Sequence, residues 1–179
     1  VVAGGSISGL LAAREIARNG FSVLVLEEGF EVGSPEHCGG LVSRKALEEL
    51  EIVPSQKTFD SEIKCAKIFS PHGKEITINS NKQQIIVINR RELDKQVARQ
   101  AKDNGAKISV KTSFQERISD GVRTSNGEIK CKYFVDCRGV SRLVNKDRDG
   151  ILLTAQYEVY ADWITKGQVE VYFDQEKYP

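Results

Sequence analysis

Residues 1–28 have the sequence VVAGGSISGLLAAREIARNGFSVLVLEE, and this stretch decides the fold of the chain. A short apolar run leads into a glycine-rich turn, which opens a helical pattern and then a second apolar run that ends at Glu27. A strand, a tight turn, a helix and a second strand make the first βαβ unit of a doubly wound α/β domain. Gly4 and Gly9 fit the G-x-G-x-x-G spacing of turns that bind adenine dinucleotides.

Each part of this turn has a separate physical task. Gly4 would allow the tight turn after the strand, and Gly9 would let the helix pack closely on the sheet. The helix N-terminus then offers free N–H groups and a positive dipole end to a diphosphate. Ser6 replaces the middle glycine, so its Cβ narrows the approach to the diphosphate, while its hydroxyl could bond a phosphate oxygen. Glu27 would accept hydrogen bonds from the ribose hydroxyls; a purely structural glycine turn is the alternative.

The composition is that of an ordinary soluble globular protein, with 40% hydrophobic and 28% charged residues. A net charge of +1 gives no reason to propose nucleic acid as a partner. No apolar stretch approaches membrane-spanning length, and no signal peptide is visible. The cysteines form no C-x-x-C pair and the histidines lie far apart, so we expect no metal site and reduced thiols in the cytoplasm. Because the chain begins inside a strand and lacks methionine, we expect a fragment.

Periodicity and turn signals predict the remaining elements. We expect helices at about 8–19, 43–50 and from Asn89 onward, where Glu92 completes a capping-box spacing. Residues 63–88 have the character of strands, and the Asp-Gly and Asn-Gly pairs at 120–121 and 126–127 predict a small antiparallel meander. Further strands are expected at 22–26, 106–110, 132–137, about 153–160 and 168–173.

Three segments occur in the order found in flavin-dependent oxidoreductases that include the aromatic hydroxylases. They are GGSISGLLAA at 4–13, INRRELD at 88–94 and FVDCRGVSR at 134–142. The loop VGSPEHCGGL at 32–41 resembles, more specifically, a loop of geranylgeranyl reductases that carries a Cys-Gly pattern near the flavin ring. The closing VEVYFDQEKYP at 169–179 also resembles that family. The chain therefore resembles the N-terminal part of a geranylgeranyl reductase.

This resemblance assigns roles to residues outside the first turn. Arg90 would contact the phosphate or ribose region of FAD, a task that suits the donor fork of a guanidinium; a solvated arginine is the alternative. Asp136 and Gly139 correspond to a second FAD motif, in which the acid orders the turn or reaches the ribose, although Arg138 stands where Asp, Ser or Thr is usual. A plain turn at a strand end is the alternative for this segment.

Cys38 is the candidate catalytic residue. The resemblance places its loop against the flavin ring, where a thiol could relay a proton or position the substrate. His37 beside it could lower the pKa of the thiol, and a small residue packed in the loop is the alternative. The residues expected to bind FAD are Gly4, Gly5, Ser6, Ile7, Ser8, Gly9, Glu27, Glu28, Cys38, Gly39, Gly40, Arg90, Asp136 and Gly139.

The resemblance implies an α/β, Rossmann-like FAD-binding domain over residues 1–150, with a parallel sheet and an antiparallel insertion at about 63–88. Residues 151–179 would begin a β-rich substrate region. The implied function is reduction of C=C bonds in a prenyl lipid or other isoprenoid by hydride from reduced FAD. An external electron donor would reduce the flavin, and a lipid substrate implies peripheral contact with a membrane. The alternatives are an FAD-dependent monooxygenase of small aromatic compounds and a non-catalytic dinucleotide-binding module.

Overall fold

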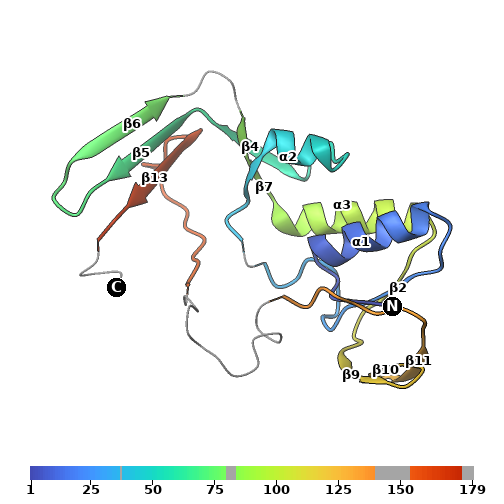
Figure 1. Ribbon diagram of the computed structural model, residues 1–179. Coiled ribbons are helices and arrows are strands. Elements are labelled where there is room, and N and C mark those ends of the chain that lie inside the picture. Colours follow the sequence, from blue (N-terminus) through green and yellow to red (C-terminus); the bar gives the residue numbers. More distant parts are fainter. Residues whose placement is uncertain (37, 80–83, 140–153, 175–179) are drawn as a thin grey trace. The chain divides into compact units, whose positions relative to one another are not determined.

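The chain forms two compact units, each made of two separate stretches of sequence (Figure 1). The first unit comprises Val1–His37 and Arg90–Ala155, and the second comprises Cys38–Asn89 and Gln156–Pro179. The computed structural model describes residues 1–36, 38–79, 84–139 and 154–174. The expected domain boundary at residue 150 stays a prediction.

The first unit is built on a parallel sheet with the strand order β12-β1-β2-β8. Its strands are β1 Val2–Ala3, β2 Leu24–Leu26, β8 Lys107–Ser109 and β12 Val135–Asp136. The chain adds β2 and β8 on one side of β1 and returns to add β12 on the other side. In such sheets the crevice at the carboxyl ends of the strands, where the order reverses, is the usual ligand site. The predicted α/β class with a parallel sheet is confirmed.

Helices α1 (Ile7–Arg18) and α3 (Arg90–Asp103) lie side by side in this unit (Figure 1). Apolar side chains of both helices are buried, at Leu10 and Ala13 of α1 and at Val97 of α3. Burial of such side chains against the strands drives helix formation here, because isolated helices of this length are marginal in water. The core around them contains Val2, Ala17, Val23, Val25, Ala101 and Ala106.

The predicted meander follows β8 and is confirmed. It consists of β9 Phe114–Ile118, β10 Gly121–Thr124 and β11 Gly127–Lys130, paired antiparallel in the order β11-β10-β9. Its register shifts between Arg123 and Thr124, next to the turn at Gly127. Gly127 has φ of 113°, a conformation that suits the predicted Asn-Gly turn.

The second unit holds two sheets, with strand orders β3-β7-β4 and β13-β5-β6. Its elements are β3 Leu41–Ser43, α2 Arg44–Glu49, β4 Phe59–Ile63, β5 Cys65–Phe69, β6 Glu75–Asn79, β7 Ile85–Ile88 and β13 Gln168–Tyr172. The strand expected at about 153–160 is wrong, because the described residues 154–160 are exposed and form no strand. Alternation alone does not make a strand when no neighbouring strand pairs with it.

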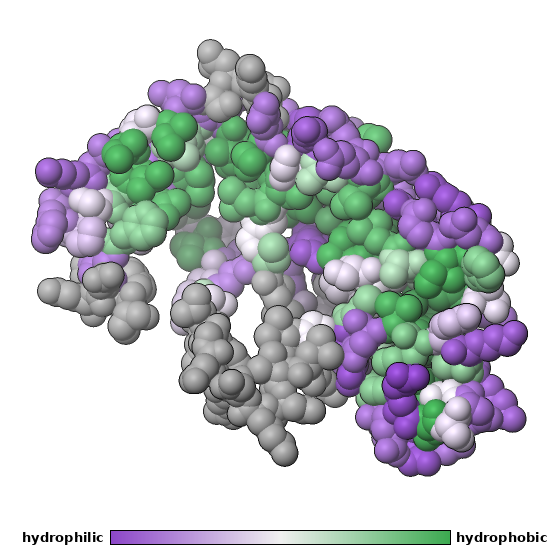
Figure 2. Space-filling model, in the orientation of Figure 1, coloured by the Kyte–Doolittle hydropathy of each residue, from purple (hydrophilic) through white to green (hydrophobic). Residues whose placement is uncertain are grey.

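One face of the β13-β5-β6 sheet is apolar. Ile68 lies opposite both Ile76 and Val171 in the strand register, and Ala66 lies opposite both Ile78 and Val169. Ile76 is 63% exposed and Ile78 is 53% exposed. Figure 2 shows apolar side chains gathered over these strands. Among the described residues, no helix is long and apolar enough to cross a membrane.

Candidate functional site

A cavity of about 330 Å³ opens at the carboxyl ends of the parallel strands of the first unit. Residues 3–6 at the end of β1, 26–29 at the end of β2, 112–114 after β8 and 137–138 after β12 all line it. This position is the switch point at which doubly wound sheets bind nucleotides. The volume lies in the range of small-molecule sites.

Glu27 at the end of β2 lines this cavity with a fixed carboxylate. Its Oε2 accepts a hydrogen bond from the Gly5 N–H at 2.8 Å, and its Oε1 accepts one from the Gly29 N–H at 2.7 Å. Each carboxylate oxygen retains further acceptor capacity for a ribose hydroxyl. A Cβ on Gly5 would lie 2.7 Å from Oε2, so this position also has no room for a side chain.

Gly4 and Gly9 allow the close packing that their spacing predicts. Gly4 has φ of 107°, and a Cβ there would lie 2.4 Å from the carbonyl oxygen of Cys137. A Cβ on Gly9 would lie 1.9 Å from the carbonyl oxygen of Gly4. Helix α1 therefore approaches the end of β1 at backbone distance, and the predicted packing role of Gly9 is confirmed.

Ser6 joins α1 to α3 instead of capping its own helix. Within the described residues, its hydroxyl makes no capping bond to α1, although Ser6 is the N-cap residue. It donates to Asp94 Oδ2 at 3.0 Å and accepts from Arg90 Nη2 at 3.2 Å. Arg90 Nε also donates to Asp94 Oδ1 at 3.4 Å. The Ser6 hydroxyl thus does not use the N–H groups in the first turn of α1, and an anion site at the helix N-terminus requires those groups.

Asp94 is one site residue that the sequence reasoning missed. It lines the cavity and is 4% exposed. Burial raises the pKa of its carboxyl above the ordinary value, while the Arg90 charge and the Ser6 hydroxyl oppose this rise. The signal was present in the INRRELD segment at 88–94, whose final acid is the partner of both Arg90 and Ser6.

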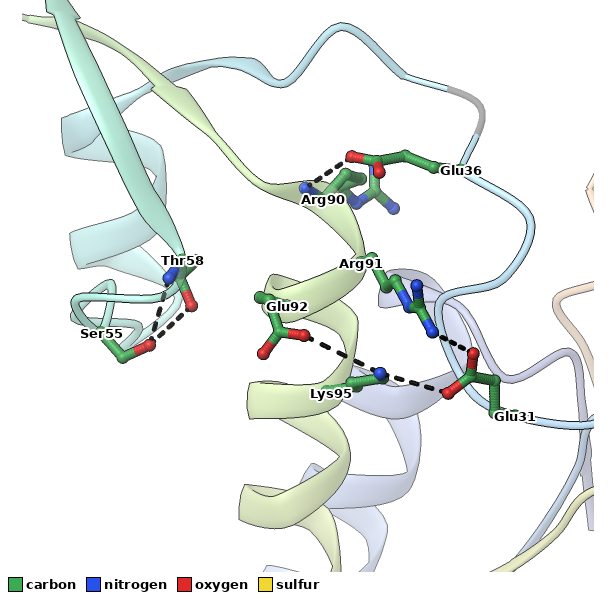
Figure 3. Close-up of polar contacts among 8 residues, drawn as sticks. All are labelled: Glu31, Glu36, Ser55, Thr58, Arg90, Arg91, Glu92 and Lys95. Atoms are coloured by element: carbon green, nitrogen blue, oxygen red, sulfur yellow. Dashed lines mark hydrogen bonds and ion pairs between the residues drawn. The ribbon is translucent and has the colours of Figure 1, made fainter.

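Carboxylates of the loop after β2 hold that loop on the first turns of α3 (Figure 3). Glu31 pairs with Arg91 and, at 3.2 Å, with Lys95. Glu36 accepts a hydrogen bond from the backbone N–H of Arg90 at 3.2 Å. Because Gly33 and Pro35 of this loop line the cavity, the clamp at Glu31 holds one wall of the site in place.

We expect this clamp to fail in acid. The Lys95 and Arg91 partners hold the pKa of Glu31 below its ordinary value. An acid with a lowered folded-state pKa contributes stability above its unfolded-state pKa and loses it as the pH falls through the folded-state value. Hydrogen exchange of the 29–36 amides, corrected for intrinsic rates, should therefore rise below about pH 4. Glu31→Gln should show faster exchange already at neutral pH; equal protection in the variant would contradict the clamp.

Asp136 and Arg138 form a local ion pair at the end of β12. Asp136 accepts from Arg138 Nε at 2.8 Å, from Nη2 at 2.5 Å and from the Arg138 backbone N–H at 3.3 Å. These bonds lower the pKa of the Asp136 carboxyl. The geometry fits the ordering of the turn by Asp136, one of its two expected roles. Gly139 has φ of 80° and is exposed.

Cys38, Gly39 and Gly40 belong to the second unit. Gly40 is buried with φ of 75°, and a Cβ there would lie 2.1 Å from the carbonyl oxygen of Ile88. Its N–H points at Cys38 Sγ at 3.5 Å, and the thiol is half-buried. His37 lies outside the described residues.

Only some of the other expected residues line the cavity. Glu28 lines the cavity, whereas Ile7 and Ser8 begin α1 and are not among its lining residues. Phe114 lines it as well and was not expected. In the part of the chain that the structure describes, no group of His, Cys, Asp and Glu could hold a metal ion.

These residues fit an adenine dinucleotide. The turn leaves no space for side chains at Gly4 and Gly9, the N-terminus of α1 faces no side-chain cap from Ser6, and Glu27 offers oxygens suited to ribose hydroxyls. Sequence comparison agrees: residues 2–56 match the model of the NAD(P)-binding Rossmann-like domain.

The chain is similar to several proteins that are named as reductases. The chain is 32% identical over 132 residues to the digeranylgeranylglycerophospholipid reductase of Methanocella arvoryzae, covering 72% of this chain and 32% of that protein. It is 30% identical over 196 residues to the enzyme of that name from Methanocaldococcus jannaschii, covering 100% of this chain and 50% of that protein. A solved geranylgeranyl bacteriochlorophyll reductase-like structure from Thermoplasma acidophilum matches with a TM-score of 0.69 at 30% identity, over 77% of this chain and 38% of that one.

The chain is therefore similar to geranylgeranyl reductases. It spans about half or less of the length of these curated relatives. The Rossmann-like dinucleotide-binding match and these reductase relatives support the predicted FAD cofactor. The p-nitrophenol 4-monooxygenase of Pseudomonas putida has a TM-score of 0.65 at 16% identity, over 80% of this chain and 41% of that one. This likeness shows a shared fold with flavin monooxygenases and no more.

Proposed function

We propose that the protein containing this chain reduces C=C bonds in the isoprenoid chains of a prenyl lipid. The observation that carries the proposal is the FAD-suited switch-point cavity of the first unit in a chain whose relatives are named digeranylgeranylglycerophospholipid reductase. Reduced FAD, when bound, supplies the hydride to one carbon of the double bond, and a proton donor completes the saturation at the other.

The residues of the first unit would bind and orient the cofactor. Glu27 would accept hydrogen bonds from the ribose hydroxyls of the adenosine half. The N–H groups at the start of α1 would bind the diphosphate, and Arg90, held by Asp94 and Ser6, would add a positive charge beside it. A glycine at position 6 would let the backbone come closer to the diphosphate. Ser6 instead fixes the side chain of Arg90, which would contact the diphosphate in its place.

The apolar sheet face of the second unit is an argument for an isoprenoid substrate. Ala66, Ile68, Ile76, Ile78, Val169 and Val171 form a continuous apolar surface across three paired strands. An exposed apolar patch of this kind marks a surface that binds an apolar partner. An isoprenoid chain carries no hydrogen-bonding groups along its length, so such a surface suits it. This substrate also favours a cytoplasmic protein in peripheral contact with a membrane, and an external electron donor would reduce the flavin.

The test uses the full-length protein with FAD reduced under anaerobic conditions. Addition of a geranylgeranyl lipid should reoxidise the flavin, and the lipid should gain the mass of one H₂ for each bond reduced. Reoxidation by oxygen with hydroxylation of an aromatic compound, and no mass gain in the lipid, would favour the monooxygenase alternative. Failure to bind FAD at all would reject both the reductase and the monooxygenase. The non-catalytic dinucleotide-binding module would then be the remaining interpretation.

We expect Cys38→Ala to slow this reoxidation by about tenfold, less than a full general-acid contribution because water can replace the thiol as a proton donor. Its FAD affinity should stay within about threefold, which separates a role in chemistry from packing. Cys38→Ser, which keeps a donor of similar size, should recover part of the rate. A loss of FAD affinity alone would show that the thiol only packs in its loop. The half-buried Cys65 offers a matched control, and Cys65→Ala should leave the rate unchanged.

A further inference from the structure

Arg138 lines the same cavity as Glu27, but two of its guanidinium nitrogens already donate hydrogen bonds to another side chain. Both Nε and Nη2 donate to the Asp136 carboxylate, at 2.8 and 2.5 Å. A bidentate pair of this kind fixes the plane of the guanidinium and neutralises much of its charge. An arginine held this way is poorly placed to bind a phosphate, and its flat face becomes the useful surface.

One face of this guanidinium rests on an aromatic ring. Its central carbon lies 4.4 Å from the ring centroid of Phe114, which also lines the cavity. Phe114 in turn stacks on Phe134, with ring centroids 4.5 Å apart and planes inclined by 21°. Arg138, Phe114 and Phe134 thus form a stack of three planar groups, and the first two of them line the cavity. The Arg138 side chain keeps 21% of its surface exposed.

We propose that Arg138 is the stacking surface for the adenine ring of FAD, with Phe114 as its support and Asp136 as its clamp. The proposal rests on FAD binding by the first unit. If Glu27 holds the adenosine ribose, the attached adenine must lie within the reach of the same cavity wall. Purine bases stack readily on aromatic side chains and on guanidinium planes. Such a contact needs planarity, which a lysine lacks although it carries the same charge.

The test measures binding of FAD and of FMN to the apo form of the full-length protein by flavin fluorescence. FMN lacks the adenosine half and therefore reports on the rest of the site. Arg138→Thr and Arg138→Lys should both weaken FAD binding by about tenfold, the low end of measured base-stacking contributions. FMN binding should not change in either variant. Asp136→Asn, which releases the fork, should weaken FAD binding by about threefold.

Arg123 of the meander provides the matched control, because it also pairs with carboxylates, those of Glu116 and Glu128, and is not among the residues that line the cavity. Arg123→Thr should bind FAD like the wild type, and circular dichroism should show all variants folded. Wild-type FAD affinity in Arg138→Lys would overturn the stacking role and assign the effect to charge. Equal loss of FAD and FMN binding would overturn it in favour of a structural role. A wild-type protein that binds no FAD would instead reject the proposed function, and this inference with it.

Discussion

Replacement of Gly9 by alanine is expected to destabilise the first unit by about 3 kcal/mol or more and to abolish FAD binding. The new Cβ would lie 1.9 Å from the carbonyl oxygen of Gly4 and 3.3 Å from the Cβ of Cys137. Both neighbours belong to strand ends of the parallel sheet, so neither can move without opening the sheet. Helix α1 must shift away from β1, and its N-terminus then leaves the position at which it would meet the diphosphate.

Urea unfolding and FAD titration of the full-length variant measure these two effects. A loss of about 3 kcal/mol corresponds to a fall in Tm of roughly 6–12 °C for a domain of this size. Gly39→Ala is the control for stability, because a Cβ there would meet no described atom within 4 Å and its φ needs no glycine. That variant should unfold within about 0.5 kcal/mol of the wild type. A Gly9→Ala protein as stable as the Gly39→Ala protein would disprove the close packing.

The first βαβ unit could be predicted from sequence because its signals are local. The glycine spacing, the apolar runs and Glu27 all lie within 28 consecutive residues, and each acts through backbone geometry that a motif records. The meander was equally accessible, since its Asp-Gly and Asn-Gly pairs set the turns. The strand expected near residue 155 shows the limit of this reasoning, because pairing depends on a partner that alternation does not reveal.

Long-range side-chain contacts were less accessible. Asp94 is 88 residues from Ser6, and no spacing rule connects a serine in a glycine turn with an acid in a distant helix. The grouping of Phe114 with Arg138 depends on how the meander returns to β12, which sequence patterns leave open. Gly5 was expected only as part of the motif, whereas its contact with the Glu27 carboxylate explains why a side chain cannot stand there.

Glu27→Gln is expected to weaken FAD binding by about 100-fold while leaving FMN binding within about threefold. The carboxylate oxygens that accept from Gly5 and Gly29 would also accept from the ribose hydroxyls. Hydrogen bonds to a charged group contribute about 1.5–3 kcal/mol each, and about 2.7 kcal/mol corresponds to the stated loss. The amide also turns an NH₂ toward one of the two backbone N–H groups, which opposes two donors and disturbs the turn.

Comparison of FAD with FMN distinguishes a lost contact to the ribose from a general disruption of the site, because only FAD carries the ribose that Glu27 would hold. Glu28→Gln is the matched control: Glu28 adjoins Glu27 and lines the same cavity, so a general effect of charge would appear in both variants. We expect Glu28→Gln to change FAD affinity by less than about threefold, so that of the two adjacent acids expected to bind FAD only Glu27 recognises the ribose. If the two variants lost affinity equally, the cavity would attract its ligand through net charge. A larger loss in Glu27→Gln would instead identify the paired carboxylate at the end of β2 as the residue that recognises the ribose.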